Sequence, residues 1–117
     1  MMFLFLMLIG YAIPLKAQVT WQSGTSYNFE KVHLGEERVT IFTFLNSGTK
    51  PLVIDNVRTT CGCTAPEWDN TPVLPGESGV IRIEFRPNRK GITEKHIKVW
   101  FKDLRKPHSL KIEAEVY

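Results

Sequence analysis

The two cysteines are the residues whose type and spacing could do chemistry. Cys61 and Cys63 are separated by one glycine in the stretch TTCGCTAPEW, residues 59–68. On a regular strand, residues two apart point to the same face with Cα atoms about 6.6 Å apart, whereas a disulfide requires Cβ atoms about 3.8 Å apart. A bond between these cysteines therefore demands a local bend. Gly62, which lacks a Cβ, makes such a bend possible.

Four interpretations of the Cys-Gly-Cys motif are open from the sequence. A local disulfide shapes a bend and stabilises little, because the chain-entropy gain is small for so short a loop. A redox-active dithiol needs a lowered thiol pKa, and Arg58 is the only cation close in sequence. Two thiolates at this spacing suit Cu(I) better than Zn(II), which takes four ligands. The fourth interpretation is a bond to the thiol of a partner protein.

The other chemically capable residues do not form a catalytic pattern. His33, His96 and His108 lie in three different segments, and we interpret each as a surface histidine without a catalytic role. No carboxylate pair is placed for acid–base catalysis, and no phosphate-binding loop or metal-protease motif is present. We therefore predict that the protein is not an enzyme and carries no cofactor. Trp100 and Tyr117 are expected to face outward on neighbouring strands, as an aromatic pair that either anchors a partner or is covered by another segment.

Apolar and polar residues alternate with period two, which predicts the strands that must position these side chains. The three clearest strands turn one apolar set inward each: Ile81, Ile83 and Phe85; Ile97, Val99 and Phe101; and Leu110, Ile112, Ala114 and Val116. The last of these strands is predicted to be an exposed edge.

Earlier strands are less clearly two-faced. Residues 37–46 carry apolar side chains on both faces, which predicts a strand that is central in its sheet or covered on both sides. A bulge at Asp55 and Asn56 would return Val57 to the core. Residues 27–34 form a candidate first strand with Phe29 and Val32 turned inward.

Turn-forming residues separate these runs, and no helical stripe is present. We therefore predict an all-β fold: an immunoglobulin-like, seven-stranded antiparallel β-sandwich with Greek-key connections.

The beginning of the chain predicts export. Residues 1–17 combine an apolar run, Pro14 and a small residue at Ala17, which is typical of a signal peptide. Residues 18–117 then form a single domain in the periplasm or outside the cell. The run is too short to span a bilayer, although the absence of Lys or Arg before it leaves an uncleaved anchor as an alternative. The net charge of +3 is spread among alternating Lys, Arg and Glu residues, which argues against nucleic-acid binding.

Two segments, FTFLNSGTKPLVIDNVRTTCGCTAPEW and LPGESGVIRIEFRPNRKG, resemble a bacterial exported family known as domain of unknown function 1573. The matching positions are Phe44, Asn46, Gly48, Pro51, Leu52, Ile54, Cys61, Gly62, Cys63, Thr64, Pro75, Gly76 and Glu77. The pattern is also distantly similar to the immunoglobulin-like domains of major sperm protein, abnormal-spindle protein and hydin. The resemblance implies an immunoglobulin-like sandwich in the cell envelope and no established activity.

Structural roles are expected for the shared motif. Asn46 and Gly48 are expected to tolerate positive φ where the chain reverses. Pro51 fixes φ as the next strand begins, and Pro75 with Gly76 builds the turn before the strand that carries Ile81.

Taken together, these features predict an exported cell-envelope immunoglobulin-like module that binds or supports other proteins without catalytic activity. The alternative is a thiol redox or Cu(I)-binding protein that uses Cys61 and Cys63. The expected partner is another envelope protein that contacts an edge strand or a loop end. No stable membrane span is expected after signal cleavage.

Overall fold

The computed structural model describes residues 18–117, so the predicted signal peptide, residues 1–17, lies outside the described part of the chain. The described strands are β1 (Val19–Trp21), β2 (Ser26–Val32), β3 (Arg38–Asn46), β4 (Ile54–Thr59), β5 (Thr64–Glu67), β6 (Ser78–Phe85), β7 (Gly91–Phe101) and β8 (His108–Val116). Residues 18–117 contain no helix that is long and apolar enough to cross a membrane.

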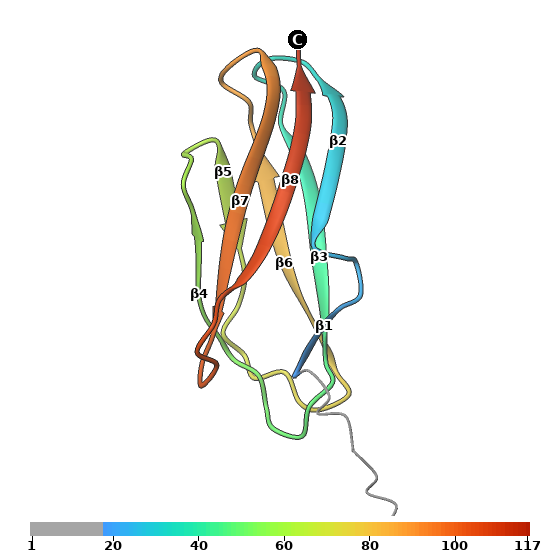
Figure 1. Cartoon of the computed structure of the whole chain (residues 1–117), viewed down its shortest axis with the longest axis vertical. Helices are drawn as coiled ribbons and strands as arrows, with labels where there is room; N and C mark the ends of the chain where they lie inside the picture. The colour runs from blue at the N-terminus through green and yellow to red at the C-terminus, as the bar shows by residue number, and fades with distance from the viewer. Residues whose placement is uncertain (1–17) are drawn as a thin grey trace, which may run out of the picture.

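The strands form two four-stranded sheets that pack face to face as a sandwich (Figure 1). Sheet A has the order β1-β3-β6-β5, and sheet B has the order β2-β8-β7-β4. All neighbours are antiparallel except β2 and β8, which are parallel. The predicted all-β, immunoglobulin-like sandwich is confirmed.

Three details of the prediction were wrong. Residues 18–117 form eight strands instead of seven, because β1 and β5 span only three and four residues and are too short to show alternation. The sheet pairing is mixed instead of purely antiparallel. The final strand β8 lies between β2 and β7, so it is an interior strand and not an exposed edge.

The apolar residues predicted to face inward form the core. Phe42 and Phe44 of β3 are both buried, and the ring of Phe44 meets that of the β7 residue Phe101 across the sandwich with centroids 5.2 Å apart. The inward sets of β6, β7 and β8 are also buried. Burying one such aliphatic or aromatic side chain contributes about 1.5–3 kcal/mol, so this interior is the main source of stability.

The irregular strands behave partly as expected. The register of β4 against β7 shifts between Ile54 and Asn56, and Ile54 and Val57 are both buried, which confirms the bulge. Strand β3 is central, lying between β1 and β6. Its outer face is not covered, however, since Val39 and Ile41 are exposed.

Asn46, at the end of β3, is a buried polar residue with a complete set of hydrogen bonds. It shares the inward phase of Phe42 and Phe44, and its side chain is 0% exposed. Its amide nitrogen donates to the main-chain oxygens of Lys50 (2.7 Å) and Val73 (2.8 Å). Its amide oxygen accepts from Gln18 Nε2 (2.8 Å) and from the Gly48 main-chain N–H (3.0 Å).

The main chain of Asn46 extends the same network. Its N–H donates to the Glu77 oxygen, and its own oxygen accepts from the Gly76 N–H. One residue thus joins the start of β1, the turn after β3 and the turn before β6. Because a buried amide that lacks partners is costly, this completeness fixes all three segments relative to one another.

The roles predicted for Asn46 and Gly48 were therefore wrong. Neither residue has positive φ; of the motif glycines only Gly76 does, at 83°. Gly48 is required for a different reason, because a Cβ there would collide with the side chain of Gln18. Gln18 cannot move away cheaply, since its Nε2 also donates to the Lys50 oxygen (2.7 Å).

We expect Asn46→Ala to lower the free energy of unfolding by about 2–4 kcal/mol, because it removes the four hydrogen bonds of a fully buried side chain, leaves the Gly48 N–H without this acceptor and opens a cavity. Urea denaturation measures this loss. The exposed Asn70 provides the control, and Asn70→Ala should change stability by less than about 0.5 kcal/mol. Equal effects of the two substitutions would contradict the role given to Asn46.

Candidate functional site

The Cys-Gly-Cys motif lies where the chain leaves sheet B for sheet A. Strand β4 ends at Thr59, and β5 begins in the other sheet at Thr64. Between them the structure joins Cys61 and Cys63 by a disulfide, with Cα atoms 5.2 Å apart. This separation is shorter than the spacing of a regular strand, so the chain bends here as the sequence predicts.

Hydrogen bonds hold this bend independently of the sulfur atoms. The Thr59 hydroxyl shares its one proton between the main-chain oxygens of Cys61 (3.3 Å) and Thr64 (3.2 Å). The Thr64 N–H donates to the Cys61 oxygen, and the Arg86 N–H donates to the Cys63 oxygen. The disulfide therefore closes a turn that is already fixed on both sides.

Gly62 does not have the steric role that was expected for it. A Cβ at this position would meet nothing within 4 Å, and its φ lies outside the left-handed region. The two sulfur atoms also differ in their surroundings. Cys63 belongs to the core and is only 9% exposed, whereas Cys61 is half-buried at the edge of the core.

The structure places Arg58, the cation named by the redox interpretation, on an aromatic ring, whereas the cations beside the disulfide are Arg89 and Lys95. Arg58 lies over the ring of Trp100, with its guanidinium carbon 5.6 Å from the ring centroid. In the part of the chain from 18 to 117, no three His, Cys, Asp or Glu side chains form a metal-binding group. Both interpretations stay predictions of the sequence.

A cleft of about 380 Å³ opens beside the disulfide. It lies between the turn, the end of β6, the β6–β7 loop and the first half of β7. Two cationic side chains contribute to its wall, and no carboxylate does. The lining residues are Cys61, Cys63, Phe85, Pro87, Asn88, Arg89, Ile92, Thr93 and Lys95.

Trp100 and Tyr117 do not form the exposed aromatic pair that was considered. Trp100 lies next to Asn56 of β4, at the end of β7 where Val99 pairs with His108. Tyr117 follows β8 at the opposite end, where Val116 pairs with Gly91. The two residues therefore lie at opposite ends of the β7–β8 pair.

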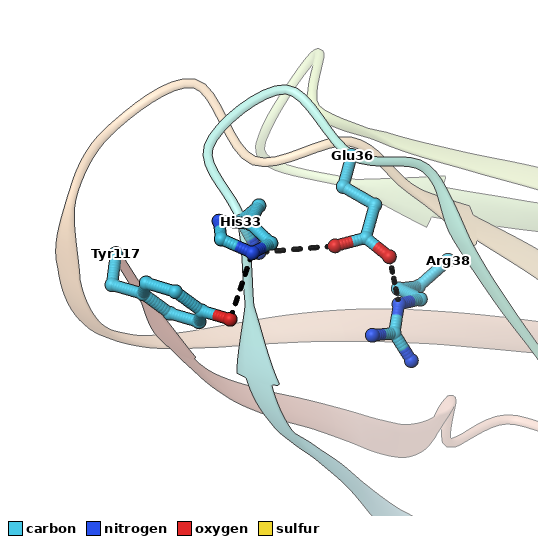
Figure 2. Close-up of polar contacts among 4 residues, drawn as sticks. All are labelled: His33, Glu36, Arg38 and Tyr117. Carbon is cyan, nitrogen blue, oxygen red and sulfur yellow. Dashed lines mark hydrogen bonds and ion pairs between the residues drawn. The ribbon is translucent and has the colours of Figure 1, made fainter.

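Tyr117 belongs to a polar cluster around the turn that follows β2 (Figure 2). Its hydroxyl lies 2.9 Å from His33 Nε2. Glu36 accepts from the main-chain N–H of His33 (3.2 Å) and from Arg38 Nε (3.0 Å). The His33 N–H, and then the charge of Arg38, hold the pKa of Glu36 below its usual value. The cluster attaches the end of β8 to this turn.

His108 is not a surface histidine, in contrast to the prediction. It is half-buried, and its Nδ1 accepts a hydrogen bond from Trp21 Nε1 (3.0 Å). Its ring also packs against Phe101 with centroids 5.3 Å apart. Burial lowers the pKa of this imidazole. The exposed His96 instead lies beside Glu94, with Nε2 3.3 Å from Oε1.

Comparisons with known proteins agree with this fold. The model of the family described as Protein of unknown function (DUF1573) matches residues 19–116. The ASH/PapD-like domain 7 of human CEP192 is similar in structure with a TM-score of 0.71 at 12% identity, over 89% of this chain and 91% of that one. None of the curated proteins compared with the chain matches it significantly.

Two further structures are similar. A protein of unknown function from Porphyromonas gingivalis W83 matches with a TM-score of 0.72 at 20% identity, over 89% of this chain and 51% of that one, so this chain spans about half of that protein. WR4, a major sperm protein family member of C. elegans, matches with a TM-score of 0.56 at 6% identity, over 87% and 100% of the two chains. These matches establish the likeness of fold and no activity.

We expect the double variant Cys61→Ser, Cys63→Ser to fold and to lose less than about 2 kcal/mol, because the closed loop is very short and the turn keeps its hydrogen bonds. Urea denaturation of the oxidised protein and the variant measures the difference. A variant that fails to fold would show that the disulfide is essential to the bend.

Acidification should weaken the fold through His108. Its lowered pKa means that the folded state binds fewer protons, so the free energy of unfolding falls as the pH drops below the ordinary His value of about 6.5 and levels off below the folded pKa. Protonation also removes the acceptor for Trp21. Urea denaturation at about pH 7.5 and about pH 5 should show a smaller loss in His108→Gln than in the wild type. Asn70→Ala, which changes an exposed residue that does not titrate, is the control and should keep the full loss.

Proposed function

Since the chain belongs to the family described as Protein of unknown function (DUF1573), we propose that it is an exported immunoglobulin-like module of the cell envelope that binds another protein and catalyses no reaction. The family match covers residues 19–116, and this domain also carries a surface that is typical of protein contacts.

The observation that carries this proposal is an apolar patch on the outer face of sheet A. We name it the sheet A patch; it consists of Val39, Ile41 and Val80. Ile41 is 52% exposed and Val80 is 56% exposed. Val80 pairs with Thr43, two residues from Ile41 on the same strand, so the two side chains are diagonal neighbours on one face. Contiguous exposed apolar side chains are typical of surfaces that contact other proteins.

Most apolar residues fill the core between the two sheets, and a few are exposed on the outer face of sheet A; this distribution supports a binding module more than an enzyme. The inward faces of both sheets fill one another and form a continuous core. The described histidines lie at separate places on the molecule, beside Tyr117, Glu94 and Trp21. Chemistry at a single centre would require such groups to converge on one pocket.

We expect the exported protein to begin at Gln18. Cleavage after Ala17 keeps every described strand, and it keeps the bonds of Gln18 to Asn46 and Lys50. Fractionation of a Gram-negative host that expresses the full chain, followed by N-terminal sequencing, tests this expectation. A chain without residues 1–17 should remain in the cytoplasm. Recovery of the full chain in the cytoplasm would contradict export.

Binding through the sheet A patch is tested in the same fractions. A photo-crosslinking amino acid at Ile41 should give a discrete crosslinked species in the envelope, and the same amino acid at Lys102, an exposed position outside the patch, should not. Identical products from the two positions, or no product from the patch, would contradict the proposed binding surface.

A further inference from the structure

The first half of β7 is an open sheet edge. Strand β8 pairs with β7 from Gly91 to Val99, whereas β4 pairs only with the second half, from Ile97 to Phe101. Among the described residues, no strand pairs with residues 92–96 on the side away from β8. In Figure 1, β7 continues past the end of β4 while the chain turns over into β5.

The phase of the hydrogen bonds identifies the unpaired groups. Just after β7, the Lys102 N–H donates to the Val53 oxygen on the β4 side. Because N–H and C=O groups alternate sides along a strand, even-numbered β7 residues face that side. On β8, the Lys111 N–H donates to Thr25, away from β7, so even-numbered β8 residues face β7.

These even-numbered β8 residues pair with odd-numbered residues of β7, since Ile112 pairs with Lys95 and Ala114 with Thr93. Both observations therefore direct the main-chain groups of odd-numbered β7 residues toward β8 and those of even-numbered β7 residues toward the β4 side. The main-chain groups of Ile92, Glu94 and His96 therefore point to the open side.

The Cys-Gly-Cys turn is what leaves this edge open. It diverts the chain from β4 into sheet A, where Thr64 pairs with Phe85 of β6. The space that a longer β4 would fill is the cleft beside the disulfide, which both cysteines, Phe85 and Lys95 line. A strand added along residues 92–96 would lie over this cleft.

The side chains at the edge indicate the chemistry of the added strand. Lys95 has the inward phase of Ile97 and Val99, and it is half-buried in the cleft wall. Neither Lys95 nor Arg89 is within ion-pair distance of a carboxylate of residues 18–117. A carboxylate entering the cleft would therefore meet two cations that have no internal ion-pair partner.

The inward-facing Lys95 also disfavours pairing of this edge with an apolar strand or with a second copy of itself. A charge at such a position discourages uncontrolled pairing of apolar strands at a sheet edge. The same charge opposes a second copy of this edge, which would bring its own Lys95 and Arg89. Ile92, which is 92% exposed, offers an apolar contact on the outer side of an added strand.

From this geometry we propose that residues 92–96 of β7 bind an extended acidic peptide segment of a partner protein as an added strand, with one carboxylate of the segment directed to Lys95 and Arg89 in the cleft. The inference deepens the proposed binding function and rests on it. Main-chain hydrogen bonds supply affinity, and the carboxylate supplies selectivity.

The free protein gives the first test, which needs no ligand. In the full chain isolated after export, the amides of Thr93 and Lys95 should exchange with solvent at least about tenfold more slowly than those of Ile92 and Glu94, because only the former are in the β8 ladder. Glu94→Pro should leave the melting temperature within about 2 °C of the wild type, since proline is tolerated where the N–H is unpaired. Thr93→Pro should lower it by about 5 °C or more. Equal protection of all four amides would overturn the open edge.

The second test uses a capped nine-residue peptide in which glutamate occupies the positions that face the cleft and valine and threonine occupy the others. Binding is followed by the amide resonances of Ile92, Glu94 and His96. The peptide should bind at concentrations up to about 1 mM. Replacing its glutamates by glutamines should weaken binding about fivefold or more, and N-methylation of its main-chain amides should abolish binding.

Variants of the protein complete the design. Glu94→Pro should abolish binding, and Lys95→Glu should reverse the preference to a peptide with lysine in place of glutamate. Lys98→Glu is the matched control on the paired half of β7 and should keep the original preference. Absence of binding, equal binding of the N-methylated peptide, or self-association of the chain through this edge would overturn the inference. Crosslinking through the sheet A patch without peptide binding at β7 would remove this inference alone and leave the proposed function in place.

Discussion

The hydrogen bonds of the buried Asn46 are the interaction on which the rest of the structure depends. The core supplies most of the stability, but apolar contacts have no direction and cannot place loops. Asn46 ties the start of β1, the turn after β3 and the turn before β6 to one point. That point sets where β4 begins and where β6 enters sheet A. Through these strands it sets the relative position of the two sheets at their shared end.

At the other end of β4, the disulfide turn completes this framework. Strand β4 is fixed at its start near the Asn46 network, follows the second half of β7 and then crosses to sheet A at the cysteines. Because the chain crosses here, β4 pairs with the second half of β7 and leaves the first half without a neighbouring strand on that side. The open edge of β7 and the cleft beside the disulfide are therefore consequences of one change of direction in the chain.

Much of the fold could be predicted from alternation, because β6, β7 and β8 each show one clearly buried face and β2, β3 and β4 show part of one. The short β1 and β5 could not be found in this way, and the pairing of β2 with β8 depends on residues far apart in the chain. The site was predicted only in part. One signal was available: Asn46 and Lys95 are polar residues that share the inward phase of a buried apolar neighbour on one side, Phe44 and Ile97 respectively. A polar residue at an inward position either makes a buried hydrogen-bond network, as Asn46 does, or lines a cleft, as Lys95 does. Only the three-dimensional contacts distinguish the two cases.

The central position of β8 in sheet B also determines when this domain can complete its folding. It is the strand furthest along the described chain, yet it lies between β2 and β7. During synthesis, which delivers the N-terminal strands first, sheet B lacks one of its two central strands until β8 itself has been made. Non-local pairing of this kind is also intrinsically slow. The domain therefore has no closed sandwich until β8 has been synthesised.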